Sequence, residues 1–147
     1  MTADRPYEAR DRDACLALFD SNTPTYFTVG ERPGFEDWLM TMDPTTYRVI
    51  ERDGRVVACG GVELEPDGAT ASLCWGMVDQ GLHKQGLGRA LTQARIEAAR
   101  ALGATALRCD TSQKTTAFYE RFGFVVTSVE TDGYSPGLDR CEMRLAL

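Results

Sequence analysis

The sequence lacks most features of metal-binding, secreted or membrane-spanning proteins. It has one histidine, and its five cysteines include no Cys-x-x-Cys pair, which argues against a structural zinc site and a secreted disulfide framework. We expect the cysteines to be small buried hydrophobic residues and no metal to be bound. No apolar run approaches the ~20 residues of a membrane span, and the charged N-terminus shows no secretory signal. We therefore expect a cytoplasmic protein without a membrane partner.

Positive charge is also scarce. The chain has 16 Lys and Arg against 22 Asp and Glu, a formal net charge of −6, and no run of basic residues. Nucleic acid is therefore not an expected partner, because binding it requires clustered positive charge. An acidic surface suits a cationic acceptor such as an amine.

The residues that are present predict one α/β (α+β) domain over 1–147, with the order β-α-α-β-β-β-α-β-α-β-β. Alternating apolar residues indicate strands and three- or four-residue spacing indicates helices. The expected strands are 6–9, 47–51, 55–65, 70–78, 106–110, 124–129 and 141–147, and the expected helices are 12–20, 35–42, 87–102 and 115–122. Strands joined through helices favour a parallel or mixed sheet.

Residues 78–91 are the most informative stretch, reading as a strand end, a short loop and the start of a helix. Backbone N–H groups at a helix N-terminus, with the helix dipole, form a site for phosphate oxygens. Gly86 and Gly88 would let a pyrophosphate approach the backbone, and Lys84 and Arg89 add positive charge. Two glycines alone also fit a simple turn.

Commoner phosphate loops do not fit this stretch. A Walker loop requires Lys-Ser or Lys-Thr after its last glycine, whereas Gly86 is followed by Leu87 and Gly88. A dinucleotide-binding loop requires a third glycine or alanine where Leu91 stands. Neither nucleotide motif is present.

Two segments resemble motifs of the GCN5-related N-acetyltransferase (GNAT) superfamily. His83-Lys84-Gln85-Gly86-Leu87-Gly88 resembles motif A, Arg/Gln-x-x-Gly-x-Gly/Ala, with His83 where the family usually has Arg or Gln. Residues 112–124, Ser-Gln-Lys-Thr-Thr-Ala-Phe-Tyr-Glu-Arg-Phe-Gly-Phe, resemble motif B, (Asn/Ser)-x(6)-Tyr-Glu-x-x-Gly-Phe. The resemblance spans about Thr46 to the C-terminus and implies a mixed, mostly antiparallel central sheet flanked by helices.

The resemblance implies an acetyl-CoA-dependent N-acetyltransferase. It would move an acetyl group to a primary amine of a small molecule or peptide by direct transfer in a ternary complex. Homodimers are common in the family, so the oligomeric state stays open and a homodimer is one option. A non-catalytic acyl-CoA-binding module is the alternative, because strand 70–78 lacks the Glu that many members carry there.

The resemblance also implies a set of acetyl-CoA-binding residues. Backbone N–H groups near Val78 would serve the pantetheine arm and the thioester carbonyl. Ser112 would contact the pantetheine, although its position also fits a helix N-cap. The full set is Met77, Val78, His83, Lys84, Gln85, Gly86, Leu87, Gly88, Arg89, Ser112 and Tyr119.

Tyr119 matches the motif B tyrosine, which protonates the leaving thiolate in many family members. A phenol has a reference pKa of ~10 against ~8.5 for a thiol, so it is protonated at neutral pH and can donate. The alternative is an aromatic that fills the helical stripe with Phe118 and Phe122.

The general base is Glu63 in this interpretation. Glu63 shares a strand face with apolar residues such as Cys59, so we expect partial burial and a raised pKa. An exposed carboxylate is the alternative. Asp110, Asp79, His83 and ordered water remain open for the same role.

Four aromatic residues predict the acceptor site. Tyr26 and Phe27 lie between the first two helices, a region that forms one wall of the acceptor site in the family. Trp75 lies on strand 70–78, and Tyr134 lies in an expected loop over 131–140. Surface packing is the alternative for each of them.

Overall fold

The computed structural model describes residues 2–147. Its strands and α-helices follow the predicted order. The strands are β1 (Thr2–Pro6), β2 (Tyr47–Arg52), β3 (Arg55–Leu64), β4 (Thr70–Val78), β5 (Ala106–Thr111), β6 (Val125–Ser135) and β7 (Leu138–Ala146), and the helices are α1 (Arg12–Ser21), α2 (Arg32–Thr41), α3 (Leu87–Ala101) and α4 (Thr116–Glu120).

The strands hydrogen-bond in the order β1-β2-β3-β4-β5-β7-β6. Strands β4 and β5 are parallel, whereas β1–β2, β2–β3, β5–β7 and β6–β7 are antiparallel. The predicted mixed, mostly antiparallel sheet is therefore confirmed. The chain divides into two compact units, Met1–Val62 with Cys74–Arg95 (unit 1) and Glu63–Leu73 with Ile96–Leu147 (unit 2). A single domain over 1–147 stays a prediction.

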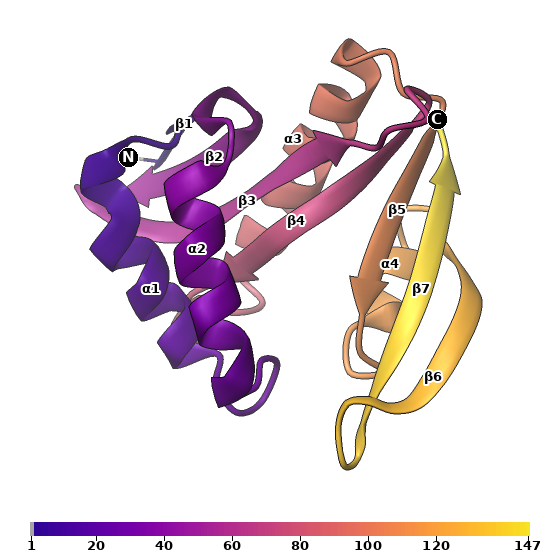
Figure 1. Ribbon diagram of the computed structural model, residues 1–147. Coiled ribbons are helices and arrows are strands. Elements are labelled where there is room, and N and C mark those ends of the chain that lie inside the picture. Colours follow the sequence, from indigo (N-terminus) through magenta and orange to yellow (C-terminus); the bar gives the residue numbers. More distant parts are fainter. Residues whose placement is uncertain (1) are drawn as a thin grey trace. The chain divides into compact units, whose positions relative to one another are not determined.

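Unit 1 buries both faces of its strands. Tyr47 packs with Phe19 of α1 on one face, whereas Ile50 packs with Leu87 and Leu91 of α3 on the other. Figure 1 shows α1 and α2 side by side in front of the strands, with α3 behind them. Successive strand residues point to opposite faces, so covering both faces buries β3 continuously from residue 57 to 62.

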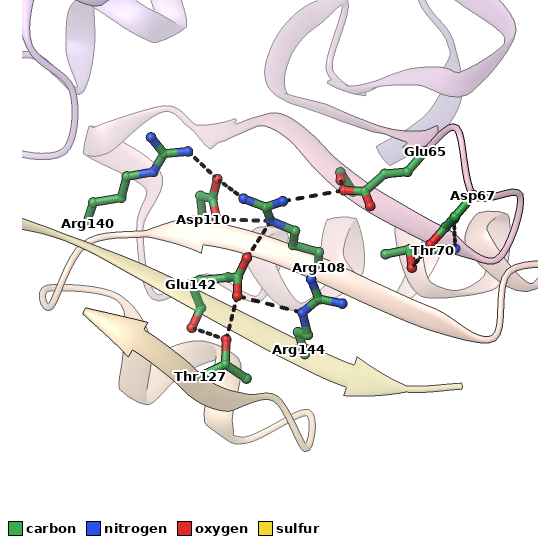
Figure 2. A network of polar contacts seen from close by, with 10 residues as sticks. Glu65, Asp67, Thr70, Arg108, Asp110, Thr127, Arg140, Glu142 and Arg144 are labelled. Atoms are coloured by element: carbon green, nitrogen blue, oxygen red, sulfur yellow. Dashed lines mark hydrogen bonds and ion pairs between the residues drawn. The ribbon is translucent and has the colours of Figure 1, made fainter. Parts of the chain in front are cut away.

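Unit 2 has one apolar and one polar sheet face. Leu107 of β5 and Met143 of β7 are fully buried, whereas their neighbours Arg108 and Glu142 pair across the two strands at 3.0 Å. Figure 2 shows these charged side chains as part of a network over β5 and β7. The alternation follows from the two-residue period of a strand.

The first strand is Thr2–Pro6 and not 6–9 as predicted. Its main chain pairs with β2 from Thr2↔Arg52 to Pro6↔Arg48. β1 is the outermost strand in the pairing order and most of its side chains are exposed. Backbone pairing defines this strand, so hydrophobic alternation could not locate it.

The expected loop over 131–140 is mostly strand. β6 extends to Ser135 and β7 begins at Leu138, so only a tight turn remains. Gly137 has φ of +80° at this turn, a conformation that glycine adopts without strain. Tyr134 is therefore a strand residue, and its predicted loop position is wrong.

All five cysteines are free and buried, as predicted. Cys15 and Cys59 are completely buried in unit 1. A hydrogen bond to Cys59 and burial raise the pKa of the Cys15 thiol. Cys15 is therefore a core residue rather than a reactive thiol, and Cys59 belongs to the same core cluster.

Asp11 is a buried carboxylate beside the start of α1. It is 4% exposed, pairs with both terminal nitrogens of Arg5 at 2.8 Å, and accepts the Glu8 N–H at 2.8 Å. The hydrogen bond from Arg5 lowers the pKa of Asp11 and outweighs burial, which acts in the opposite direction. Arg5 also pairs with Glu51 at 2.8 Å.

We predict that Asp11→Asn destabilises the protein at neutral pH by about 1–3 kcal/mol, because it leaves Arg5 without its buried partner. The pKa of Asp11 is depressed in the folded state, so its stabilisation is present above the unfolded value of about 4 and is lost as the pH falls through the folded value. Urea unfolding at pH 7 and at about pH 3 measures both effects. The variant should lose less stability on acidification than the wild type.

The matched control is Asp13→Asn, which removes an exposed carboxylate of α1. Equal unfolding free energies for the two variants at both pH values would contradict the role given to Asp11.

Candidate functional site

The predicted phosphate loop follows β4 and ends at α3. It contains a short 3-10 helix, Gln80–Leu82, where the Asp79 carboxylate accepts the Gly81 N–H at 2.9 Å. Lys84 and Gly86 have φ of +66° and +82°. The Gly86 carbonyl accepts the N–H of Ala90 at 3.1 Å, which begins the helical hydrogen bonds of α3.

The first turn of α3 can therefore bind an anion. The N–H groups of residues 87–89 precede the first intrahelical bond, so they have no acceptor within the helix. The Leu87 side chain is buried and anchors this turn. Lys84 and Arg89 are exposed, and a Cβ built on Gly86 meets no atom within 4 Å. Donors without an intrahelical acceptor, the positive end of a 15-residue helix and two cations suit a phosphate group.

β4 is irregular just before this loop. Trp75 has φ of +42°, and its carbonyl accepts a hydrogen bond from the Tyr47 hydroxyl at 2.7 Å. Burial, with the nearby Cys59 and Cys15 thiols, raises the pKa of Tyr47, so the hydroxyl stays protonated and can donate. A non-glycine residue at positive φ is strained and persists only where its surroundings hold it.

Gly76 allows the Arg95 side chain of α3 to lie against β4. A Cβ at residue 76 would lie 2.7 Å from Arg95 Cζ, too close for a real contact. Arg95 is 2% exposed, so it has little room to move away. Sequence reasoning gave no role to Tyr47, Gly76 or Arg95, because they match no motif.

Three of the four predicted acceptor residues lie in unit 1. The Trp75 ring centroid is 6.3 Å from Phe27 and 5.0 Å from Phe35. Tyr26 lies instead beside His83, with ring centroids 5.3 Å apart. Tyr134 belongs to unit 2, on β6.

The peptide group between Val78 and Asp79 has three hydrogen-bond partners. Its N–H donates to the Val57 carbonyl at 2.9 Å. Its oxygen lies 2.8 Å from Asn22 Nδ2 and 3.0 Å from His83 Nε2. A carbonyl oxygen can only accept, so His83 Nε2 carries a hydrogen. Sequence reasoning missed Asn22, which lies in a polar stretch without a motif.

Ser112 and Tyr119 lie in unit 2, between β5 and β6. Ser112 is buried and its hydroxyl oxygen accepts the Lys114 N–H at 3.3 Å. Thr115 is the N-cap of α4, so the N-cap reading of Ser112 is wrong. Tyr119 is half-buried, and its ring lies edge-on to Phe118 and Phe124.

The candidate bases differ in their surroundings. Glu63 is exposed, so the expected partial burial is wrong: the buried run of β3 stops at Val62. Asp110 accepts from Arg140 at 2.7 Å and pairs with Arg108 at 3.3 Å (Figure 2). Asp79 forms an ion pair with Arg55, in addition to its bond to Gly81.

Residues 2–147 contain no group of three or more His, Cys, Asp or Glu side chains that could hold a metal ion. None of their helices combines the length and the apolar character needed to cross a membrane.

Comparison with known proteins decides the family. A family model described as "Acetyltransferase (GNAT) family" matches residues 12–124. The chain belongs to the GNAT acetyltransferase family. The predicted relationship is thus confirmed, and with it the class of enzyme, an acyltransferase. No sequence among the curated proteins matches significantly.

Solved structures of GNAT proteins share the fold over the whole chain. A structure from Desulfovibrio desulfuricans, assigned to the GNAT family, has 25% identity and a TM-score of 0.82, covering 99% of each chain. The ribosomal-protein-S18-alanine N-acetyltransferase of Escherichia coli has 20% identity and a TM-score of 0.81, covering 99% of this chain and 94% of that one. The yncA protein of Salmonella typhimurium, solved with its cofactor acetyl-CoA, has 19% identity and a TM-score of 0.79, covering 100% and 94%.

We predict that Gly76→Ala lowers the free energy of unfolding by about 1–3 kcal/mol, because the added methyl group collides with the buried Arg95 side chain. Chemical denaturation measures the change. Gly34→Ala is the control, since its Cβ would lie at an ordinary 3.9 Å from the Trp75 ring. Equal stability of the two variants would show that β4 and α3 can separate at this point without cost.

Proposed function

We propose that this protein is an acetyl-CoA-dependent N-acetyltransferase that moves an acetyl group to a primary amine by direct transfer in a ternary complex. The observation that carries the proposal is the loop before α3. Gly86, at positive φ, is the last residue of this loop, and the long helix α3 begins directly after it. The N–H groups of the first turn of α3 therefore follow the loop.

In this proposal the pyrophosphate of acetyl-CoA binds at the start of α3. The backbone N–H groups of Leu87, Gly88 and Arg89 are the donors. The exposed side chains of Lys84 and Arg89 add positive charge, whereas Leu87 contributes only its backbone, because its side chain belongs to the core.

The neighbouring residues of the predicted set have different parts. The Met77 side chain is buried among core residues, so we assign its backbone and that of Val78 to the pantetheine arm and the thioester carbonyl. Gln85 accepts from Arg52 at 2.9 Å and would border the phosphate site. Ser112 is proposed to contact the pantetheine.

Acetyl transfer requires an unprotonated amine, a donor for the oxyanion and a proton for the leaving thiolate. The amine nitrogen attacks the thioester carbonyl carbon and the C–S bond breaks, leaving acetylated amine and the thiol of CoA. We assign oxyanion stabilisation to the β4 backbone near Val78 and the acid to Tyr119. The proton acceptor is proposed to be Glu63, with Asp110 or ordered water as the alternatives.

The acceptor is proposed to be a small-molecule or peptide amine. Phe27 and Trp75 would form one aromatic wall. Tyr26, which lies beside His83, and Tyr134 are proposed as further contacts. The net charge of −6 favours a cationic acceptor at long range. A screen should include small amines and peptide N-termini, since the Escherichia coli neighbour is named for an alanine of a ribosomal protein.

We predict that Gly86→Glu abolishes acetyl-CoA binding, because a carboxylate side chain at that point repels the pyrophosphate and strains a backbone at φ of +82°. Calorimetric titration with acetyl-CoA measures the loss. Gly68→Glu is the matched control: Gly68 has φ of +68° and its Cβ also meets no atom within 4 Å. Wild-type affinity in Gly86→Glu would rule out this loop as the binding site.

We predict that Tyr119→Phe lowers turnover about a hundred-fold and leaves acetyl-CoA affinity unchanged, because the ring remains but the proton donor is lost. Thiol release with an amine found in the screen gives the rate. Unchanged turnover would assign Tyr119 to packing alone. Tight acetyl-CoA binding by the wild type without thiol release on any amine would favour the non-catalytic acyl-CoA-binding module.

A further inference from the structure

Asn22 and His83 are the only asparagine and the only histidine of the chain, and both contact the same carbonyl oxygen. Asn22 Nδ2 lies 2.8 Å from Val78 O, and His83 Nε2 lies 3.0 Å from it. A carbonyl oxygen has two lone pairs, so these two donors use its full capacity. The last carbonyl of β4 is thus held from two different segments.

Asn22 belongs to the segment that carries the aromatic acceptor residues. Its side-chain amide also donates to Leu18 O at 2.8 Å, which fixes it to the end of α1. Its backbone carbonyl accepts the N–H groups of Tyr26 at 2.8 Å and Phe27 at 3.1 Å. Asn22 is 2% exposed, so a single buried residue organises this loop and ties it to β4.

His83 belongs to the proposed acetyl-CoA loop. Its ring lies beside that of Tyr26, with centroids 5.3 Å apart. A second link joins the same segments, because Ser21 Oγ accepts the Gln80 N–H at 3.3 Å. These contacts therefore form a closed ring within unit 1, from Asn22 to the Val78 carbonyl, to His83, to Tyr26 and back to Asn22.

We propose that Asn22 is a positioning residue for acetyl transfer, acting through the Val78 carbonyl. The bridge Asn22–Val78–His83 fixes the end of β4 and holds the acceptor-side segment, residues 22–27, against the acetyl-CoA loop, residues 79–86. This inference rests on the proposed function. It also predicts coupling: loosening the acceptor-side segment weakens acetyl-CoA binding, and a bound acetyl-CoA orders that segment.

The physical basis of the coupling is the shared carbonyl. Without the Asn22 side-chain amide, two buried carbonyl oxygens, Val78 O and Leu18 O, each lose a hydrogen-bond donor. An unsatisfied carbonyl away from water costs free energy. The segment 22–27 then moves to find other partners and takes the Tyr26 ring away from His83. The loop must be reordered when acetyl-CoA binds, so its affinity falls.

The test compares acetyl-CoA dissociation constants by calorimetry for the wild type, Asn22→Ala and Thr41→Ala. Thr41 is the matched control: its hydroxyl donates to Asp37 O at 3.1 Å at the end of α2, and it lies outside residues 22–27 and 79–86. We expect Asn22→Ala to bind acetyl-CoA about ten-fold more weakly and Thr41→Ala to bind as the wild type does. A lower melting temperature of Asn22→Ala with wild-type affinity would overturn the inference, because it is the result of a purely structural role.

A second pair of variants tests the bridge at His83. If Asn22→Ala does not fold, these two variants alone decide whether the bridge supports acetyl-CoA binding. His83→Phe keeps a ring beside Tyr26 but loses the donor to Val78 O, whereas the side-chain amide of His83→Gln can replace that donor. We expect His83→Phe to bind acetyl-CoA more weakly than His83→Gln. Equal affinity in both variants would contradict the bridge.

NMR separates this inference from the proposed function. The imidazole signals of His83 are unique in the chain, so they can be assigned without a full spectrum. We expect Asn22→Ala to shift and broaden them in the free protein, and Thr41→Ala to leave them in place. If the wild type does not bind acetyl-CoA, the proposed function fails and the bridge is still tested; unchanged His83 signals in Asn22→Ala overturn the bridge itself.

Discussion

The peptide group between Val78 and Asp79 is the point on which the site depends. Its N–H donates to Val57 on β3, and its oxygen is held by Asn22 and His83. A backbone group with all its partners satisfied in a buried setting is costly to displace. The end of β4 is consequently fixed, and the loop that leads to α3 starts from a defined place.

The site combines this fixed point with strained backbone on either side. Upstream, Trp75 adopts positive φ and is held by Tyr47 and the close approach of Arg95 to Gly76. Downstream, Lys84 adopts positive φ before the helix begins. Strain of this kind persists where a well-packed scaffold determines it, and unit 1 supplies that scaffold by burying both faces of its strands. The GNAT family membership gives a reason for such an arrangement, since a transferase must hold its acyl donor in a fixed orientation.

The sequence predicted the order of the main elements and the loop before α3, because both have strong local signals: a change of hydrophobic period and two close glycines. It could not predict features set by distant contacts. β1 is defined by backbone pairing with β2. Tyr134 lies in a strand because the β6–β7 hairpin is longer than its turn residues indicate. Glu63 is exposed because the buried part of β3 ends at Val62. Asn22 has no local signal, because its role exists only when residue 78 lies beside it in the folded chain.

The most direct test of the central claim is a calorimetric titration of the wild-type protein with acetyl-CoA, with CoA and ATP as controls. The account predicts saturable binding of acetyl-CoA and much weaker binding of ATP, because the loop matches neither nucleotide motif. Absence of acetyl-CoA binding at millimolar concentration would contradict it, and residues 79–86 would then be only a turn between β4 and α3.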